Sequence, residues 1–313
     1  MIVGAHAGVL NEHARRLLDE GLRAFPMLDA DAAEVLLPLR PLVGRCRICG
    51  ELEQLTKEHV PPAAAFNRQT APMHSADEWF ARDESGELPG GELQQGGIWG
   101  YTLCRDCNSL TGHRYGDEYR LWAVSIINAL ADAKVNVREL EAQPEIPDGP
   151  ITLGGDPGPR PGAFVRQVLA MMCTLSADFD LAGRYPAIRR LILDRSVETL
   201  PDGMSVGLTG YIGGYPRVVG PQLVAHPDED AWYWLMELAN PPLATLMVLG
   251  GNRPYRHVFD LSPFTLVPPD ASTPVSARLG VAIGYTMYPG DYRTKGMVEA
   301  QRAQAEAAAV ASV

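Results

Sequence analysis

The sequence predicts an α+β protein, and three observations support this fold class. Apolar residues recur at helical spacing through much of the chain up to about residue 194. After Pro201 the pattern changes to short apolar runs separated by Gly- and Pro-rich turns, which are typical of strands. With 313 residues, of which 46% are hydrophobic, the chain can bury a substantial core. Helices followed by a run of strands favour a second α+β region with an antiparallel sheet.

Changes in composition along the chain predict five regions. The first is an N-terminal helical arm that we interpret as a packing or oligomerisation element, because apolar residues follow helical spacing in residues 11–25 and 31–37. The last is an Ala-rich tail that favours a helix. In order, the predicted regions are the arm (1–43), a cysteine-containing module (44–141), a Pro/Gly connector (142–162), an α+β domain of unknown role (163–296) and the tail (297–313).

Individual elements are predicted from the same patterns. In the module, helical spacing predicts a helix that begins near Gly112 and continues through Leu130. Two further helical stripes lie in residues 164–175 and 188–193. The runs predicted as strands are residues 206–213, 218–225, 243–249, 257–267 and 279–287. The aromatic run at residues 232–234 is interpreted as packing against the sheet.

Charge and hydropathy exclude several classes of protein. The formal net charge is −11, which argues against a protein that coats nucleic acid through a basic surface. No apolar run approaches the roughly 20 residues of a membrane-spanning helix, and the N-terminus lacks the basic start of a signal peptide. We therefore expect a cytoplasmic protein with no membrane partner. In a reducing compartment, close cysteine pairs hold metals more often than disulfides.

Four of the five cysteines form two C-x-x-C pairs. Cys46 and Cys49 make the first pair, and Cys104 and Cys107 make the second. Two intervening residues let both thiolates of a pair face one ion, so two pairs together predict a tetrahedral structural zinc site. The fifth, Cys173, lies on an apolar helical stripe and is interpreted as a core thiol.

Polar residues flank both cysteine pairs in a recognisable pattern. Glu58-His59-Val60-Pro61-Pro62 follows the first pair, and Asn108 comes directly after the second. The chain resembles the HNH, or ββα-metal, nuclease family, in its branch with two zinc-binding C-x-x-C pairs. The resemblance covers residues 44–122 and extends to bacterial proteins that carry the same motif. It implies an HNH-like module ahead of the second α+β region.

The resemblance also implies residue roles. His59 would be the general base, Asn108 would orient it, and Glu58 would help bind a catalytic divalent ion, Mg²⁺ or Mn²⁺. The third metal ligand stays open between His113 and Asp117, since His113 has the more usual residue type and Asp117, nine residues after Asn108, has the closer spacing. The implied activity is that of a metal-dependent phosphodiesterase, most simply a DNA endonuclease and hence a hydrolase.

Two features of the sequence speak against DNA as the substrate. Residues 44–122 contain eight Lys or Arg and twelve Asp or Glu, so the module lacks an obvious basic stripe. A long insert at residues 67–100 could cover a smaller substrate. The alternatives are an HNH-scaffold enzyme acting on a nucleotide or other small molecule, and a non-catalytic zinc-binding interaction protein. A positive face would still form if a set of eight arginines lay on one side of the folded protein. These are Arg114, Arg120, Arg160, Arg166, Arg184, Arg189, Arg190 and Arg195.

Overall fold

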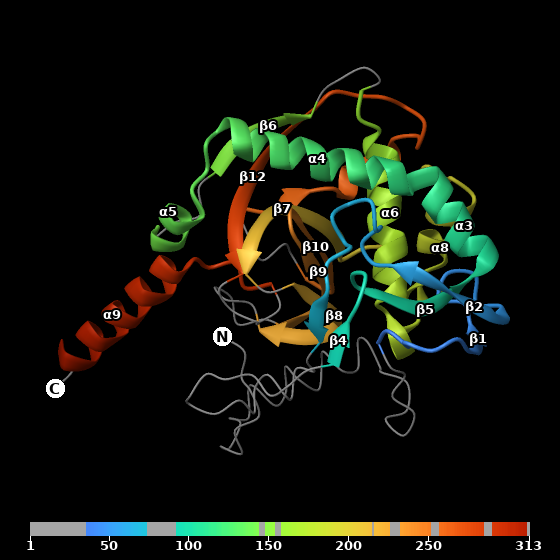
Figure 1. Cartoon of the computed structure of the whole chain (residues 1–313), viewed down its shortest axis with the longest axis horizontal. Coiled ribbons are helices and arrows are strands. Elements are labelled where there is room, and N and C mark those ends of the chain that lie inside the picture. Colours follow the sequence, from blue (N-terminus) through green and yellow to red (C-terminus); the bar gives the residue numbers. More distant parts are fainter. Residues whose placement is uncertain are drawn as a thin grey trace, which may run out of the picture.

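The computed structural model describes most of the chain after the N-terminal arm. The described residues are 36–73, 92–143, 148–153, 158–214, 216–225, 232–251, 257–284 and 290–311. The predicted helix at residues 11–25, nearly all of that at 31–37 and residues 74–91 of the insert lie outside them. Within the described residues the protein is a mixed α+β fold with antiparallel sheets, as the sequence predicts (Figure 1).

The cysteine-containing module is built on a small antiparallel sheet. The sheet has the strand order β1-β2-β5, with β1 at Val43–Arg45, β2 at Leu52–His59 and β5 at Trp99–Cys104. A continuous helical segment follows β5, made of α3 (Arg105–Thr111), the π-helical η2 (Gly112–Gly116) and α4 (Asp117–Asp132). Between β2 and β5 in the chain, β3 (Ala71–Met73) and β4 (Glu92–Gln94) form a two-stranded ribbon.

The helical segment begins earlier than the predicted start near Gly112. Cys104 has an extended backbone at the N-cap of α3, and its sulfur accepts the backbone N–H of Cys107. The usual N-cap residues are Ser, Thr, Asp and Asn. Because a cysteine occupies this position, the sequence carries no N-cap signal for a helix start here. Asn108, directly after the second cysteine pair, therefore lies within the first helix.

A larger sheet of seven strands makes up the rest of the protein. Its main order is β6-β12-β7-β10-β9-β8, with β11 paired to β7. All neighbours are antiparallel except β12 and β7, which run parallel. The strands are β6 (Asp148–Leu153), β7 (Met204–Gly214), β8 (Arg217–Ala225), β9 (Trp232–Asn240), β10 (Leu243–Leu249), β11 (Phe259–Asp260) and β12 (Val275–Gly284).

Three parts of this sheet differ from the predicted elements. β9 was not predicted as a strand; all but its first residue are buried, so both of its faces are covered and its sequence shows no alternation of apolar and polar residues. β6 lies inside the predicted Pro/Gly connector and pairs with β12. Residues 257–267, predicted as one strand, contain only the short β11 and the 3₁₀ turn η4 (Ser262–Leu266).

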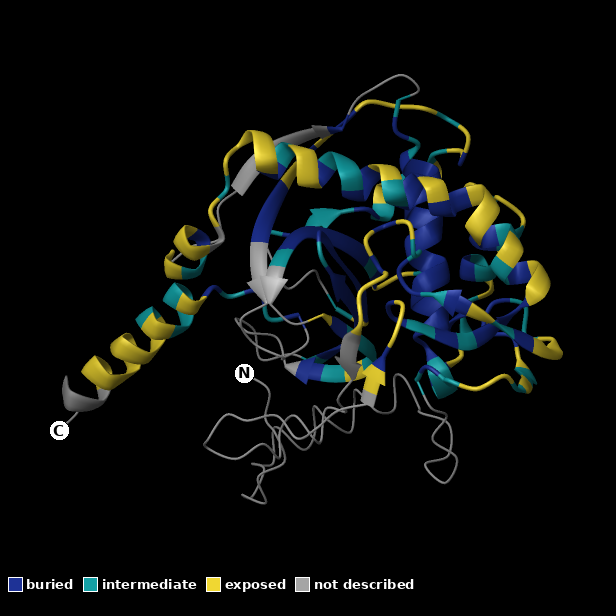
Figure 2. Cartoon of the chain, in the orientation of Figure 1, coloured by how far each residue is buried: buried dark blue, intermediate teal, exposed yellow. Residues whose placement is uncertain are grey.

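Helix α6 (Pro161–Thr174) packs between the small sheet and the large one (Figure 1). All fourteen of its residues are buried, and it appears as a dark column in Figure 2. Phe164 of α6 stacks on Trp122 of α4 with ring centroids 3.9 Å apart. One cluster of buried side chains extends from the cysteine pairs through α6 to the large sheet, so the two halves share a core. The short elements beside α6 are η3 (Ala177–Phe179), α7 (Leu181–Arg184) and α8 (Pro186–Leu193).

The C-terminal tail forms α9 (Lys295–Ala311), which extends away from the rest of the protein (Figure 1). Its residues are mostly exposed (Figure 2), and it contacts the short helix α5 (Val137–Ala142). Among the described residues, no helix combines the length and the apolar character needed to cross a membrane.

Candidate functional site

The first cysteine pair lies in a tight turn between β1 and β2. The N–H of Cys46 donates to the carbonyl of Glu51 at 2.9 Å, and the N–H of Gly50 donates to the carbonyl of Cys46 at 2.8 Å. Gly50 has a φ of +82°, which only glycine adopts without strain. This turn brings the Cys49 thiol back to the same side as Cys46.

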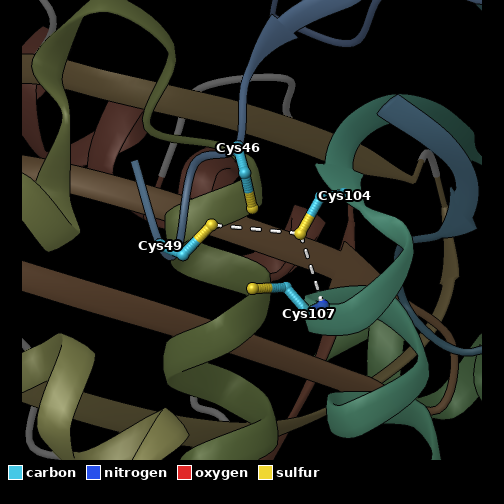
Figure 3. A group of neighbouring side chains, drawn as sticks. All are labelled: Cys46, Cys49, Cys104 and Cys107. Atoms are coloured by element: carbon cyan, nitrogen blue, oxygen red, sulfur yellow. Dashed lines mark hydrogen bonds between the residues drawn. The ribbon is translucent and has the colours of Figure 1, made fainter. Parts of the chain in front are cut away.

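The four thiols converge from the two pairs (Figure 3). Their sulfur atoms all lie within 4.8 Å of one another, and Sγ of Cys49 is 3.9 Å from Sγ of Cys104. Sulfurs arranged tetrahedrally at about 2.3 Å from a zinc ion would be about 3.8 Å apart, which matches this distance. None of the cysteines forms a disulfide. The cluster could therefore hold a metal ion and is compatible with structural zinc.

Cys46 and Cys49 differ in acidity. Hydrogen bonding from the Cys107 thiol lowers the pKa of Cys46 to about 4, although burial opposes this shift. Burial raises the pKa of Cys49 to about 11. Because the thiolate is the metal-binding form, Cys46 is a more readily available ligand than Cys49.

Arg47 connects the first cysteine pair to the rest of the protein. Its backbone N–H donates to the carbonyl of Thr102 at 3.1 Å, and its guanidinium donates to the carbonyls of Leu36 and Thr174. Thr174 is the last residue of α6. The guanidinium therefore fixes the turn of the first pair against the central helix.

Glu58 points into the protein rather than toward solvent. The hydroxyl of Thr102 donates a hydrogen bond to its carboxyl group. Thr102 is at the irregular point of the β2–β5 pairing, where Thr56 pairs with Leu103 and Lys57 pairs with Tyr101; a bulge of this kind re-aims a side chain. Burial raises the pKa of the Glu58 carboxyl well above its usual range, and the charge on Arg47 counteracts this shift.

His59 ends β2 beside the turn that leads into β5. Its Nε2 is 3.1 Å from the carbonyl oxygen of Gly96, which can only accept a hydrogen bond. In the neutral ring, Nε2 therefore carries the proton, and Nδ1 is left with its lone pair. Burial lowers the pKa of His59 below its ordinary 6.5, and the nearby charges of Lys57 and Arg68 lower it further, whereas the bond to Gly96 opposes the shift.

Asn67 fixes the backbone around His59. Its amide nitrogen donates to the carbonyls of Pro61 and Ile98 at 2.6 and 2.9 Å, and its oxygen accepts the N–H of Ile98 at 2.7 Å. A Cβ atom at Gly97 would lie 2.2 Å from the Asn67 carbonyl oxygen, so glycine is required there. The sequence placed Asn67 only at the start of an insert and gave it no role.

Asn108 lies on α3 and reaches back to β2. Its amide nitrogen donates to the hydroxyl of Thr56 and to the carbonyl of Lys57, both at 3.0 Å. The carbonyl of Lys57 is two residues before His59. Asn108 thus fixes the strand that carries His59, which is compatible with an orienting role through the backbone.

A pocket of about 200 Å³ opens beside these residues. One wall comes from the end of β2 and the chain after it, and another comes from α3 and Gly112. The third wall is a face of α6. The lining residues are Lys57, Glu58, His59, Val60, Pro62, Ala63, Leu103, Asn108, Thr111, Gly112, Gln167, Ala170, Met171 and Thr174. The structure thus brings Glu58, His59 and Asn108 to one cavity.

The two candidates for the third metal ligand lie elsewhere. His113 and Asp117 are both exposed, and neither lines the pocket. The nine residues from Asn108 to Asp117 are helical throughout, so they span about 13 Å, whereas the pocket reaches only the first turn after Asn108. Among the described residues, the four cysteines are the one group of three or more His, Cys, Asp or Glu side chains close enough to share an ion. The predicted set of Glu58 with His113 or Asp117 is not assembled.

The eight arginines that could have formed a positive face are largely engaged in structural contacts. Arg166 is fully buried, and its guanidinium donates to main-chain carbonyls, including those of Leu191 and Gly162. Four others form ion pairs, and further ones donate to main-chain carbonyls. The ion pairs are Arg120–Asp117, Arg160–Glu118, Arg190–Glu198 and Arg195–Asp270. Among the described residues, the positive charges that act on His59 are instead those of Lys57 and Arg68.

Two polar residues of α6 that face the pocket were missed by the sequence analysis. Gln167 and Thr174 lie seven residues apart, on the same helical face as Ala170 and Met171. The sequence pattern indicated only the apolar stripe of this helix. The available signal was the presence of uncharged polar residues in a helix that is mostly apolar, because buried polar residues need a partner.

No protein-family model matches the chain, and comparisons with curated proteins and with solved structures likewise give no match. Any functional assignment therefore depends on the residues and the geometry described above.

Proposed function

We propose that this protein is a phosphodiester hydrolase with an HNH-type ββα frame, in which His59 is the general base. The observation that carries this proposal is the position of the His59 ring: its Nε2 is bonded to the Gly96 carbonyl, and the ring lines the pocket beside Asn108. A backbone acceptor on one ring nitrogen sets the tautomer that a base requires. The succession of β2, β5 and α3, with the cysteine pairs at its edges, supports the HNH assignment.

Zinc is the metal we propose for Cys46, Cys49, Cys104 and Cys107. Four thiolates fill a tetrahedral coordination shell, so the ion would hold β2, β5 and α3 together and perform no catalysis. The catalytic Mg²⁺ or Mn²⁺ implied by the family resemblance does not fit the predicted ligands, since His113 and Asp117 lie outside the pocket. We therefore derive no step through such an ion.

The residues around the pocket support a simple hydrolytic step. Nδ1 of His59 takes a proton from a water molecule, the water oxygen forms a bond to phosphorus, and the bond from phosphorus to the leaving alcohol breaks as that oxygen takes a proton from solvent. Lys57 lies at the pocket edge, with its Nζ 3.9 Å from the centroid of the Trp99 ring. Its positive charge would attract the phosphate.

Cleavage assays with the purified, zinc-loaded full-length protein test this function. We expect hydrolysis of at least one phosphodiester among supercoiled plasmid, single-stranded DNA, single-stranded RNA and bis(p-nitrophenyl) phosphate. Each reaction is run with EDTA, Mg²⁺ or Mn²⁺, which measures the dependence on a divalent ion directly. If the folded protein cleaves none of these substrates under any condition, the proposal is wrong.

The pH dependence gives a second prediction. A general base must be neutral, and the pKa of His59 is lowered, so the rate should be constant near neutrality and should fall only below pH 6.5. Removing the positive charge of Arg68 with Arg68→Gln should move this acidic limb to higher pH. Initial rates measured from pH 4.5 to 8 check both statements. A limb centred above pH 6.5 in the unmodified protein would contradict the role of His59.

Hydrolysis of a nucleotide or other small molecule is the second candidate function. It is favoured by the small volume of the pocket and by the engagement of the arginines in structural contacts. An extended duplex would need a row of free cationic side chains to bind its phosphates.

A further inference from the structure

One face of the small sheet places two aromatic side chains beside His59. Lys57 and His59 are two residues apart on β2, so their side chains point to the same side of the strand. Residues that lie directly opposite on neighbouring strands also share a face. Trp99 is the opposite partner of His59, and Tyr101 is that of Lys57. The proposed general base therefore shares this face with a lysine, a tryptophan and a tyrosine.

The indole ring of Trp99 is fixed by two contacts. Its Nε1 donates to the carbonyl of Gln95 at 3.0 Å. The ring also meets that of Tyr101 edge to face, with ring centroids 6.1 Å apart and an interplanar angle of 87°. A ring held by a hydrogen bond and an aromatic contact has a defined orientation, so it can support a flexible neighbour.

The flexible neighbour is Lys57. Its Nζ lies 3.9 Å from the centroid of the Trp99 ring, well within the range of a cation–π interaction. Lys57 is exposed, and within the described part of the chain no hydrogen bond or ion pair occupies its ammonium group. The charge of Lys57 also lowers the pKa of His59, so the ammonium group lies near the base. Its N–H donors are thus available to a bound anion at the edge of the pocket.

A lysine that moves freely is a weak binding point for a single phosphate. Its four-carbon stem must be ordered when the ligand binds, and this costs conformational entropy. If the Trp99 ring already orders the stem in the free protein, that cost is not incurred on binding. The same positive charge then binds the phosphate more tightly, which is the general effect of preorganisation.

We propose that Trp99 is a positioning residue, which holds the Lys57 ammonium group beside His59 as a preformed binding point for one non-bridging phosphate oxygen. The inference rests on the proposed function, which puts a phosphodiester next to His59. A phosphodiester carries one negative charge, and a single ammonium group matches it. Trp99 itself touches no reacting atom and acts through Lys57.

A double-mutant cycle on the hydrolysis of bis(p-nitrophenyl) phosphate tests this coupling. Lys57→Met, which removes the charge and keeps most of the stem, should raise KM about tenfold or more. Trp99→Leu should raise KM about two- to fivefold, the range of a cation–π contact at an exposed site, with kcat nearly unchanged. In the Lys57→Met background, Trp99→Leu should have no further effect on KM, because the lysine is its only route to the substrate.

Trp99→Phe separates the aromatic face from the hydrogen bond of the indole. Phenylalanine keeps a ring under the ammonium group but cannot donate to the carbonyl of Gln95. The KM of Trp99→Phe should therefore lie closer to that of the unmodified protein than the KM of Trp99→Leu does. Equal KM values for the two variants would assign the effect to the bond with Gln95 and overturn the inference.

Nuclear magnetic resonance gives a readout that does not require catalysis. In the free protein, the ring current of Trp99 should shift the resonances of the Lys57 ε-methylene protons upfield, and Trp99→Leu should abolish this shift. Titration with dimethyl phosphate in the same spectra measures the affinity for a phosphodiester directly. This affinity should fall in Lys57→Met and, to a smaller extent, in Trp99→Leu.

The outcomes separate this inference from the proposed function. If the unmodified protein cleaves phosphodiesters but the substitutions at Lys57 and Trp99 act independently on KM, the inference is wrong and the function stands. Unshifted Lys57 resonances in the unmodified protein, or no binding of dimethyl phosphate, would also make it wrong. If dimethyl phosphate binds with an affinity that depends on both residues and no substrate is cleaved, the inference stands and the hydrolase is rejected.

Discussion

Replacing His59 with alanine should lower the rate of phosphodiester cleavage by about 10²–10⁴-fold, the usual contribution of a general base. The side chain is partly exposed at the mouth of the pocket, and within the described part of the chain its one polar contact is the bond to the Gly96 carbonyl. Its removal should therefore change the fold very little. Single-turnover rates, together with circular dichroism of the same samples, measure the two effects separately.

His113 provides the matched control for this experiment. It is an exposed histidine on the helical segment that follows Asn108, and it does not line the pocket. His113→Ala should keep full activity, which would also exclude the ligand role that the family resemblance implied for it. Equal rates for His59→Ala and the unmodified protein would remove His59 as the base.

Replacing Cys104 with serine should abolish stoichiometric zinc binding and reduce the free energy of unfolding by several kcal/mol, since binding of a structural zinc ion contributes directly to folding. The substitution also removes the sulfur that accepts the Cys107 N–H at the start of α3. We expect less than one zinc ion per chain by elemental analysis and a clearly lower melting temperature.

Cys173→Ala is the appropriate comparison, because Cys173 is a buried thiol outside the cluster. This variant should lose some stability through the small cavity that it creates, yet it should keep one zinc ion per chain. A Cys104→Ser protein with unchanged zinc content and melting temperature would show that the four thiols do not hold a structural metal.

The cysteine cluster could be predicted from the sequence because its geometry is local. Two residues between cysteines suffice to aim both thiols of a pair at one point, whatever the rest of the chain does. The closeness of Glu58, His59 and Asn108 follows from the same frame, since β2 and α3 are each adjacent to a pair. These residues meet at one pocket, as their positions beside the cysteine pairs indicated.

Other parts of the site depend on contacts that a single sequence does not reveal. Spacing alone suggested Asp117 as a ligand, but an early helix start at Arg105 carries Asp117 along the helix axis and away from the pocket. Gln167 lies on a helix more than a hundred residues from His59 in the chain, and only tertiary packing brings it to the pocket. Strand β9 shows no alternation because both of its faces are buried.

The central position of α6 has a consequence for any attempt to transplant this site. In many multidomain proteins a catalytic module can be excised and fused elsewhere, but here the cysteine-containing segment supplies only part of the cavity. The wall that bears Gln167 and Thr174 is encoded after the predicted connector, and Arg47 is hydrogen-bonded to the last residue of that same helix. A graft of residues 44–141 alone would transfer the cysteine cluster and the histidine without the wall of the pocket that α6 provides.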